Sequence, residues 1–397
     1  DAVETLAEML GMEVPSSGPE RDVGREAALY ALLAEADQLY RGALRENEAA
    51  VTYLKNRGID GATAGHFGMG YAPDAWDTVL KRLGGNETRV KDLLEAGLIV
   101  KNDQGRQYDR FRGRIMFPIR DPRGRVIGFG GRALDSGEPK YLNSPETPVF
   151  HKGQALYGLY EARQFGTKEG RPGAILVVEG YLDVASLAQH GIGPAVATLG
   201  TATTTDHVRR LTRMAESVIF CFDGDRAGRA AAWKALETVL PHAGDQVELK
   251  FLLLPDGEDP DSLVRDRGAE AFRDLMDKAQ PLSEFLLGEL TRRVDLSSAD
   301  GRSQLAALTR PLLERLPEGV YRALLLTQLA DRIGLAPQHL ETLLEPTEAA
   351  RAPRGKTPSY PSDPGSDRRS PLIRKAIELL LHHPASGTNL EVVKGLA

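Results

Sequence analysis

The first part of the chain carries apolar residues at helical spacing. Residues 26–44 and 46–57 are rich in alanine, leucine and glutamate, and two shorter segments, 77–83 and 89–96, continue the pattern. Apolar side chains that recur at this spacing are typical of helices that bury one face. Gly58 directly follows the second segment, where a glycine commonly ends a helix. We therefore predict a mainly helical start to the chain.

Two strand-like runs follow, at residues 114–120 and 125–130. The tetrapeptide Asp-Pro-Arg-Gly at 121–124 separates them, and its proline and glycine favour a tight turn. The pattern predicts a β-hairpin. The second run and the residue after it contain three glycines, Gly128, Gly130 and Gly131. Because glycine has no side chain, a neighbouring strand or a ligand can approach the backbone closely there.

From residue 173 onward, strand-like and helical segments alternate. The run at 174–178 is apolar throughout, as expected of a strand buried on both faces. Further strands are predicted at 195–199, 217–222 and 246–254, and helices at 183–189, 205–214 and 226–240. This alternation predicts an α/β unit with a mostly parallel sheet flanked by helices. In such sheets, ligands bind outside the carboxyl ends of the strands.

The chain beyond Leu254 is predicted to be helical again, through about Leu344. Residues 346–370 have the composition of a linker, because 11 of these 25 residues are proline, glycine or serine. A last apolar helix is predicted at 372–381.

Net charge, cysteine content and the length of the apolar runs exclude several further classes of protein. The 397 residues carry a net charge of −6, which gives no whole-chain reason to expect nucleic-acid binding. The single cysteine, Cys221, excludes a disulfide within this chain and fits a reducing cytosol; its apolar surroundings predict an inert core thiol. The apolar runs are too short for a membrane span, and we expect no signal peptide.

Acidic residues follow three of the predicted strands. Glu179 and Asp183 follow the first strand, Asp223 and Asp225 follow the third, and residues 256–261 after the fourth contain four acids. Each group alone is more typical of a solvated side chain, a turn or a helix cap. Because the carboxyl ends of parallel strands share one edge, their joint occurrence predicts a cluster.

Clustered carboxylates repel one another, and a divalent cation relieves that repulsion. Oxygen ligands favour Mg²⁺ or Mn²⁺ over zinc or copper. Two or three such ions would suit an enzyme that acts on nucleoside triphosphates.

Longer strings resemble known families. Residues 178–183 together with 223–225 are similar to the Toprim module that bacterial primases, topoisomerases and some nucleases share. Strings that resemble bacterial replicative primases of the DnaG type lie at 110–120, 128–132, 140–146, 150–153, 156–159, 222–228 and 254–261. The likeness is nearly continuous from about Leu54 to Leu286.

The resemblance implies roles for six carboxylates. Glu179 matches the family's candidate catalytic acid near the metals, and Asp223 and Asp225 match its principal metal ligands. Further metal-associated carboxylates are matched by Asp183, Asp259 and Asp261.

A basic segment lies before the acidic one. Residues 101–152 hold 11 lysines and arginines against six acids, so the segment carries +5. The resemblance implies that template and nucleotide phosphates are bound by Arg57, Arg132, Lys140 and Lys152, with Tyr141 and Asn143 near the template. For Tyr141, stacking on a base and packing in the core are equally supported. If residues 110–114 form a strand, their three alternating arginines lie on one face.

The resemblance also implies a domain organisation, with an α/β (overall α+β) fold. We expect a basic helical and β-hairpin subdomain at 1–172, a Toprim subdomain at 173–256 and a helical subdomain at 257–345. A linker at 346–370 and the start of a helicase-interacting domain at 371–397 would follow. One cysteine does not build the zinc ribbon expected of the full-length family member, and the chain begins with Asp1. We therefore expect a catalytic core with flanking residues.

The implied function is primase activity: metal-dependent synthesis of short RNA primers on single-stranded DNA. The implied partners are single-stranded DNA, nucleoside triphosphates, the RNA primer and the replicative helicase, with no membrane. We expect a cytoplasmic monomer that acts at the replication fork in the nucleoid. Two alternatives remain open: another Toprim enzyme, such as a topoisomerase or nuclease, and a non-catalytic scaffold that binds nucleic acid or the helicase.

Overall fold

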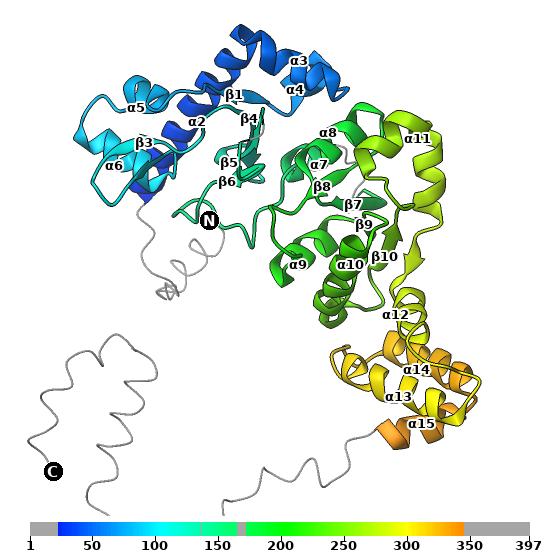
Figure 1. Cartoon of the computed structure of the whole chain (residues 1–397). Coiled ribbons are helices and arrows are strands. Elements are labelled where there is room, and N and C mark those ends of the chain that lie inside the picture. Colours follow the sequence, from blue (N-terminus) through cyan, green and yellow to red (C-terminus); the bar gives the residue numbers. More distant parts are fainter. Residues whose placement is uncertain (1–22, 136, 165–171, 345–397) are drawn as a thin grey trace, which may run out of the picture. The chain divides into compact units, whose positions relative to one another are not determined.

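The structure is a computed structural model that describes residues 23–135, 137–164 and 172–344. The chain divides into two units, 1–340 and 341–397, and the description below concerns the described residues, whose helices and strands are labelled in Figure 1. The linker predicted at 346–370 and the helix predicted at 372–381 lie outside the described residues.

The first part of the described chain is mainly helical, as predicted. Its helices are α2 (Val23–Glu46), α3 (Glu48–Asn56), α4 (Gly61–His66), α5 (Thr78–Leu83) and α6 (Glu87–Glu95). Asn47 begins α3 because its side chain accepts a hydrogen bond from the amide of Ala50 at 2.8 Å. Gly58 ends that region with φ +76°, a backbone conformation that glycine adopts without strain.

The predicted hairpin forms the centre of an antiparallel sheet with the order β1-β4-β5-β6. These strands are β1 (Gly70–Ala72), β4 (Arg114–Arg120), β5 (Val126–Ala133) and β6 (Tyr141–Asn143). A separate two-stranded ribbon joins β2 (Ile99–Lys101) to β3 (Gln107–Asp109). The close approach expected at the glycines is confirmed at Gly130, where a β-carbon would overlap the ring of Tyr181.

The three alternating arginines do not share a strand face. Strand β4 begins only at Arg114, whose guanidinium is buried and donates to the carbonyl of Gly131 at 3.4 Å. Arg110 donates to the carbonyl of Asn143 at 3.0 Å, and Arg112 lies over the ring of Trp76. Arg110 and Arg112, which precede the strand, therefore hold loops in place.

The alternating region forms the predicted mostly parallel sheet, with the order β11-β10-β9-β7-β8. Its strands are β7 (Ala174–Val178), β8 (Ala195–Ala197), β9 (Ser217–Phe222), β10 (Glu248–Leu253) and the short antiparallel β11 (Gln280–Pro281). Its helices are α7 (Leu159–Gln164), α8 (Tyr181–Gln189), α9 (Thr205–Met214), α10 (Arg226–Val239) and α11 (Pro260–Asp277), with a 3-10 turn at Leu240–His242. The predicted fold class is confirmed.

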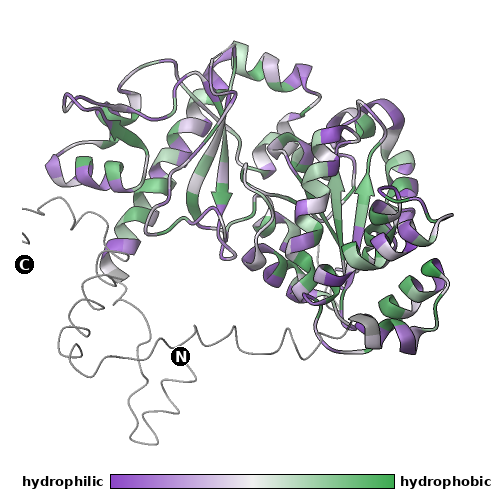
Figure 2. Cartoon of the chain, turned by 60° about the horizontal axis from the view of Figure 1, so that its bottom comes forward, coloured by the Kyte–Doolittle hydropathy of each residue, from purple (hydrophilic) through white to green (hydrophobic). Residues whose placement is uncertain are grey.

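Apolar residues line the strands of both sheets (Figure 2). All six residues of β9 are buried, and Cys221 among them is 1% exposed, so the predicted core thiol is confirmed. Burial raises the pKa of Cys221, which keeps the thiol neutral and unreactive.

Four more helices follow the parallel sheet: α12 (Leu282–Thr291), α13 (Ala299–Leu313), α14 (Val320–Ile333) and α15 (Pro337–Leu344). Across the described ranges, none of the helices combines the length and the apolar character that crossing a membrane requires.

Candidate active site

The Asp-Gly-Asp sequence after β9 forms a loop that requires glycine. A β-carbon at Gly224 would overlap the carbonyl oxygen of Leu254, so the loop packs directly on the segment that leaves β10. Asp225 then begins α10, because its Oδ1 accepts from the amide of Gly228 at 2.7 Å. This packing brings the acids that follow β9 beside those that follow β10.

The loop after β7 is organised in a similar way. Gly180 precedes α8, and its amide donates to Oδ2 of Asp183 at 2.9 Å. One oxygen of Asp183 is therefore committed to the start of its own helix. Glu179, directly after the strand, makes no hydrogen bond through its side chain to another described residue, and the same holds for Asp223.

The third acidic segment begins α11. Asp259 accepts from the amide of Ser262 at 2.6 Å and so caps the helix. Glu258 pairs with Arg267 at 2.7 Å and also accepts from the Ser262 hydroxyl. Asp261 is buried at 3% exposure, and its Oδ1 has no hydrogen-bond partner among the described residues.

The electrostatics show that these carboxylates share one environment. Burial, followed by the charges of Asp223 and Asp225, raises the pKa of Glu179. Burial, followed by the charges of Asp259 and Asp225, raises the pKa of Asp223. The pKa of Asp183 is raised to about 7, first by burial and then by Asp259, Asp223 and Asp261. The predicted gathering of acids from three strand ends is therefore present.

The donor set fits a hard divalent cation, since every candidate ligand is a carboxylate oxygen and three of the groups hold raised pKa values. Glu179 and Asp223 have both oxygens available, whereas Asp183, Asp225 and Asp259 each commit one oxygen to a helix start. Within the described residues, no three acidic, histidine or cysteine side chains are already arranged around a single ion position.

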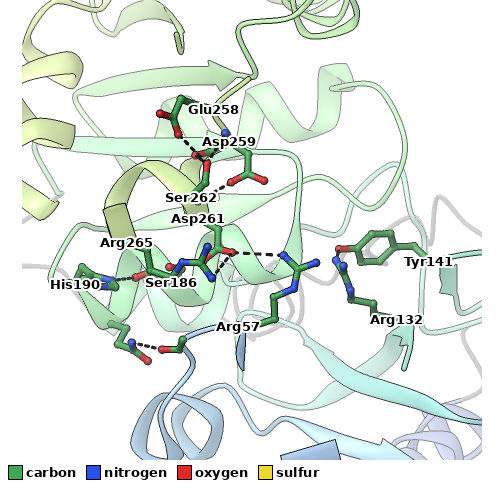
Figure 3. A network of polar contacts seen from close by, with 12 residues as sticks. Arg57, Arg132, Tyr141, Ser186, His190, Glu258, Asp259, Asp261, Ser262 and Arg265 are labelled. Carbon is green, nitrogen blue, oxygen red and sulfur yellow. Dashed lines mark hydrogen bonds and ion pairs between the residues drawn. The ribbon is translucent and has the colours of Figure 1, made fainter. Parts of the chain in front are cut away.

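Arg57 connects the helical part of the chain to the acidic segment (Figure 3). This residue ends α3, and its Nη1 lies 3.9 Å from Oδ2 of Asp261, which also has Nη1 of Arg265 at 4.0 Å. The neighbouring Gly58 accepts a hydrogen bond from Gln189 in α8 at 2.7 Å. Asp261 is therefore oriented toward two arginines.

Arg132 and Tyr141 lie side by side on β5 and β6 (Figure 3). The guanidinium of Arg132 donates to the Tyr141 hydroxyl and lies 5.0 Å from the centre of that ring. Arg132 is 7% exposed, whereas Tyr141 is 37% exposed. The exposure places Tyr141 on the surface rather than in the core, and its ring centre also lies 6.2 Å from that of Tyr181.

Asn143 joins β6 to the parallel sheet. Its amide nitrogen donates to the carbonyl of Leu199 at 2.7 Å, and its oxygen accepts from the Tyr181 hydroxyl at 2.6 Å. Tyr181 also stacks on Phe117 with ring centres 5.0 Å apart. The side chain of Asn143 therefore links β6 to the parallel sheet through Tyr181, a residue that the sequence analysis gave no role; the template contact that the resemblance implies for Asn143 stays a prediction.

The two lysines differ in their surroundings. Lys140 is exposed at the end of the loop that leads into β6, and its carbonyl accepts from Arg114 at 3.4 Å. Lys152 is half-buried, and its main-chain amide donates to Glu146 at 3.0 Å. Of the four predicted phosphate ligands, Arg132, Lys140 and Lys152 thus lie in the basic segment 101–152, whereas Arg57 lies before it, at the end of α3.

Three family models match successive parts of the chain. They describe the N-terminal domain of the DNA primase catalytic core (residues 39–163), a Toprim-like domain (176–264) and the DnaB-helicase binding domain of primase (283–338). The DNA primase of Escherichia coli K12 is 46% identical over 402 residues, which cover 100% of this chain and 67% of the relative. The chain belongs to the bacterial DNA primase family.

A second curated primase and a solved primase domain also match this chain. The DNA primase of Pseudomonas aeruginosa is 52% identical over 355 residues, covering 86% of this chain and 53% of the relative. This chain therefore spans about half to two thirds of the length of these curated primases. A crystal structure of a primase domain from P. aeruginosa matches with a TM-score of 0.76 and 53% identity over 80% of this chain and 99% of that one.

A DnaG primase catalytic domain bound to single-stranded DNA matches with a TM-score of 0.75 and 50% identity, over 80% of this chain and 100% of that one. The segment that matches the helicase-binding model runs from α12 through α14 to the first residues of α15. The start of a helicase-interacting domain expected at 371–397 lies outside the described residues.

Proposed function

We propose that the chain is the catalytic core of a DNA primase, a nucleotidyltransferase that synthesises short RNA primers on single-stranded DNA from nucleoside triphosphates. The proposal rests above all on the carboxylates that gather from three strand ends, in a chain of this family whose residues 101–152 carry a charge of +5. The similar primase domain bound to single-stranded DNA supports the assignment of the template.

In this reaction the 3′-oxygen of one nucleotide forms a bond to the α-phosphorus of the next triphosphate. The bond from that phosphorus to the bridging oxygen breaks, pyrophosphate leaves, and the 3′-hydroxyl releases a proton. Bound Mg²⁺ or Mn²⁺, in two or three ions, would supply charge neutralisation for the triphosphate. Asp223 and Asp225 would hold the ions, with Glu179, Asp183, Asp259 and Asp261 as further carboxylates nearby.

The basic residues have a separate task in this proposal. Arg57, Arg132, Lys140 and Lys152 neutralise phosphates of the template or the incoming nucleotide. Tyr141 stacks on a template base with its exposed ring, next to Arg132. No amino-acid side chain forms a covalent intermediate.

Glu179 has two candidate roles, proton acceptor or metal ligand. In the metal-free protein, burial and the charges of Asp223 and Asp225 raise the pKa of Glu179, which favours the role of proton acceptor. The variant Glu179→Gln separates the roles. If Glu179 accepts the proton, the variant loses the acidic limb of the pH–rate profile at saturating Mg²⁺. If it tunes a metal, the variant keeps the acidic limb of the profile and requires a higher Mg²⁺ concentration for half-maximal activity.

We also propose the wider setting of the protein. The replicative helicase is a partner, since residues 283–338 match the helicase-binding model. Nucleoside triphosphates and the RNA primer complete the set of ligands. We place the protein in the cytoplasm, at the nucleoid replication fork, as a monomer; the zinc of the full-length family member is not expected to bind this chain.

Primer synthesis tests the proposal directly. The chain is incubated with single-stranded DNA, labelled nucleoside triphosphates and Mg²⁺, and short RNA products are separated by size. The proposal predicts RNA products that require template and metal. Relaxation of supercoiled DNA without primer synthesis would instead indicate a topoisomerase-type activity. Binding of single-stranded DNA with no product under any divalent ion would indicate a non-catalytic scaffold.

A further inference from the structure

The main chain of Lys152 is held from both sides by side chains of other segments. Its amide donates to Oε1 of Glu146 at 3.0 Å, and its carbonyl oxygen lies 3.2 Å from Nε2 of His207. The next carbonyl, that of Gly153, accepts from the Thr204 hydroxyl at 2.6 Å. Within the described ranges, no ion pair engages the Lys152 ammonium, so this group remains available for a ligand while its backbone is fixed.

The hydrogen bonds of His207 determine which ring nitrogen carries the proton. The backbone amide of Thr204 donates to Nδ1 at 3.3 Å, so Nδ1 is an acceptor. Nε2 must therefore carry the hydrogen and donate it to the carbonyl of Lys152. The side chain of His207 is 0% exposed, and burial lowers its pKa, which keeps the ring in this neutral form.

The position of this contact in the sheet connects it to the acidic cluster. His207 lies in the first turn of α9, which follows β8, and β8 runs parallel to β7. The first turn of α9 therefore lies toward the same carboxyl edge as Glu179. The segment after Lys152 is also attached to β8, because Tyr157 and Ala197 exchange two backbone hydrogen bonds of 3.0 Å.

We propose that His207 is a positioning residue, which holds the carbonyl of Lys152 through its Nε2–H so that the Lys152 ammonium meets the phosphates of the incoming nucleotide. This inference rests on the proposed function, and it adds a residue that no motif in the sequence singled out. His207 touches neither nucleotide nor metal in this account. Its effect passes through Lys152.

Kinetics of two variants test the role. His207→Phe fills the buried space but removes the donor, whereas His207→Gln keeps an N–H that can reach the same carbonyl. We expect His207→Phe to raise KM for nucleoside triphosphates about tenfold with kcat within about twofold, and His207→Gln to restore most of the loss. An unchanged KM with weaker binding of single-stranded DNA would overturn the nucleotide assignment in favour of the template.

A double variant shows whether the effect passes through Lys152. If it does, His207→Phe has no further effect on KM in a Lys152→Ala background. Equal effects in both backgrounds would overturn the proposal, because His207 would then act independently of the lysine. Thermal unfolding of each variant identifies any loss of activity that is due to a loss of folded protein.

Trypsin cleavage gives a readout that does not depend on primase activity. Trypsin cuts after lysine, and the Lys152–Gly153 bond is held by the His207 and Thr204 contacts. We expect His207→Phe to be cut there faster than the wild type and His207→Gln, with equal cutting after Arg106 in the β2–β3 ribbon. Unchanged cutting would overturn the positioning role. A wild type that shows this protection but makes no primers would refute only the proposed function.

Discussion

Oδ2 of Asp261 lies 3.9 Å from Nη1 of Arg57, although α3 and α11 are about two hundred residues apart along the chain. Asp261 is 3% exposed, so its negative charge depends on nearby cations. We predict that Arg57→Ala lowers the free energy of unfolding by about 1 kcal/mol, because among the described residues the buried carboxylate then keeps one cation, Arg265.

A double-mutant cycle measures this coupling by chemical denaturation. Arg57→Ala should cost less stability in an Asp261→Asn background, where the buried charge is absent. Arg209→Ala is a suitable control, since Arg209 pairs at 3.2 Å with Asp206, and both side chains of this pair are exposed. Additive effects of the two substitutions would show that the 3.9 Å approach carries no interaction energy.

The glycine of the Asp-Gly-Asp loop makes a second prediction. A β-carbon at Gly224 would overlap the Leu254 carbonyl, so Gly224→Ala must displace the loop that carries Asp223 and Asp225. We predict a loss of about 1–3 kcal/mol of stability and a larger requirement for Mg²⁺ in primer synthesis. Gly288→Ala in α12 is the control, because nothing lies near its β-carbon and alanine favours a helix. A Gly224→Ala protein with wild-type stability would contradict the close packing.

The raised pKa of Asp183 predicts a pH-dependent stability. With a pKa of about 7 in the folded protein, against about 3.9 when unfolded, the folded state binds more protons between these values. Without divalent ions, the wild type should therefore lose stability as pH rises from 4 to 7. Asp183→Asn keeps the acceptor for Gly180 and removes the charge, so it should be more stable than the wild type by on the order of 2 kcal/mol at pH 8.

Urea unfolding in EDTA at pH 5 and pH 8 checks this prediction. The advantage of Asp183→Asn should be smaller at pH 5, where the wild-type carboxyl is already protonated. Asp295→Asn is a control whose effect on stability should have the opposite sign. Hydrogen bonds from Ser297 lower the pKa of Asp295, so removing its charge should make the protein less stable than the wild type at pH 8. An advantage of Asp183→Asn that does not change with pH would rule out the raised pKa.

The exposed ring of Tyr141 predicts a contribution to template binding. Stacking of a base on an aromatic ring contributes about 1–3 kcal/mol, so Tyr141→Ala should weaken binding of single-stranded DNA roughly tenfold. Tyr141→Phe keeps the ring and should bind nearly as well as the wild type, although it loses the hydrogen bond to Arg132. Fluorescence anisotropy with a labelled oligonucleotide measures both, and equal losses would favour the hydroxyl over the ring.

Much of the fold could be predicted from local pattern. Strand β7 occupies the predicted residues because an apolar run there is bounded by Gly173 and Glu179. The three-residue strands β1 and β6 are different, because too few side chains define a period. Strand β6 is established by pairing of Tyr141 with Arg132 on β5, a contact between strands that no local signal shows.

Some features of the candidate site could likewise be predicted from the sequence, and others could not. The acids at the strand ends could be predicted because the parallel sheet brings the ends of β7, β9 and β10 to one edge. The link between Asn143 and Tyr181 spans 38 residues, and the contact between Lys152 and His207 spans 55. Such contacts follow from tertiary packing, and a single sequence contains no spacing that reveals them.

The central claim is that Asp223 and Asp225 support metal-dependent primer synthesis. The double substitution Asp223→Asn and Asp225→Asn tests it most directly, because asparagine retains the cap of α10 and removes two negative charges. The control is Asp274→Asn with Asp277→Asn, the same charge change at exposed positions of α11. Primer synthesis with Mg²⁺ and binding of single-stranded DNA are measured on the same preparations. The account predicts at least about a hundredfold loss of synthesis with DNA affinity within about twofold; synthesis at the wild-type rate would contradict it.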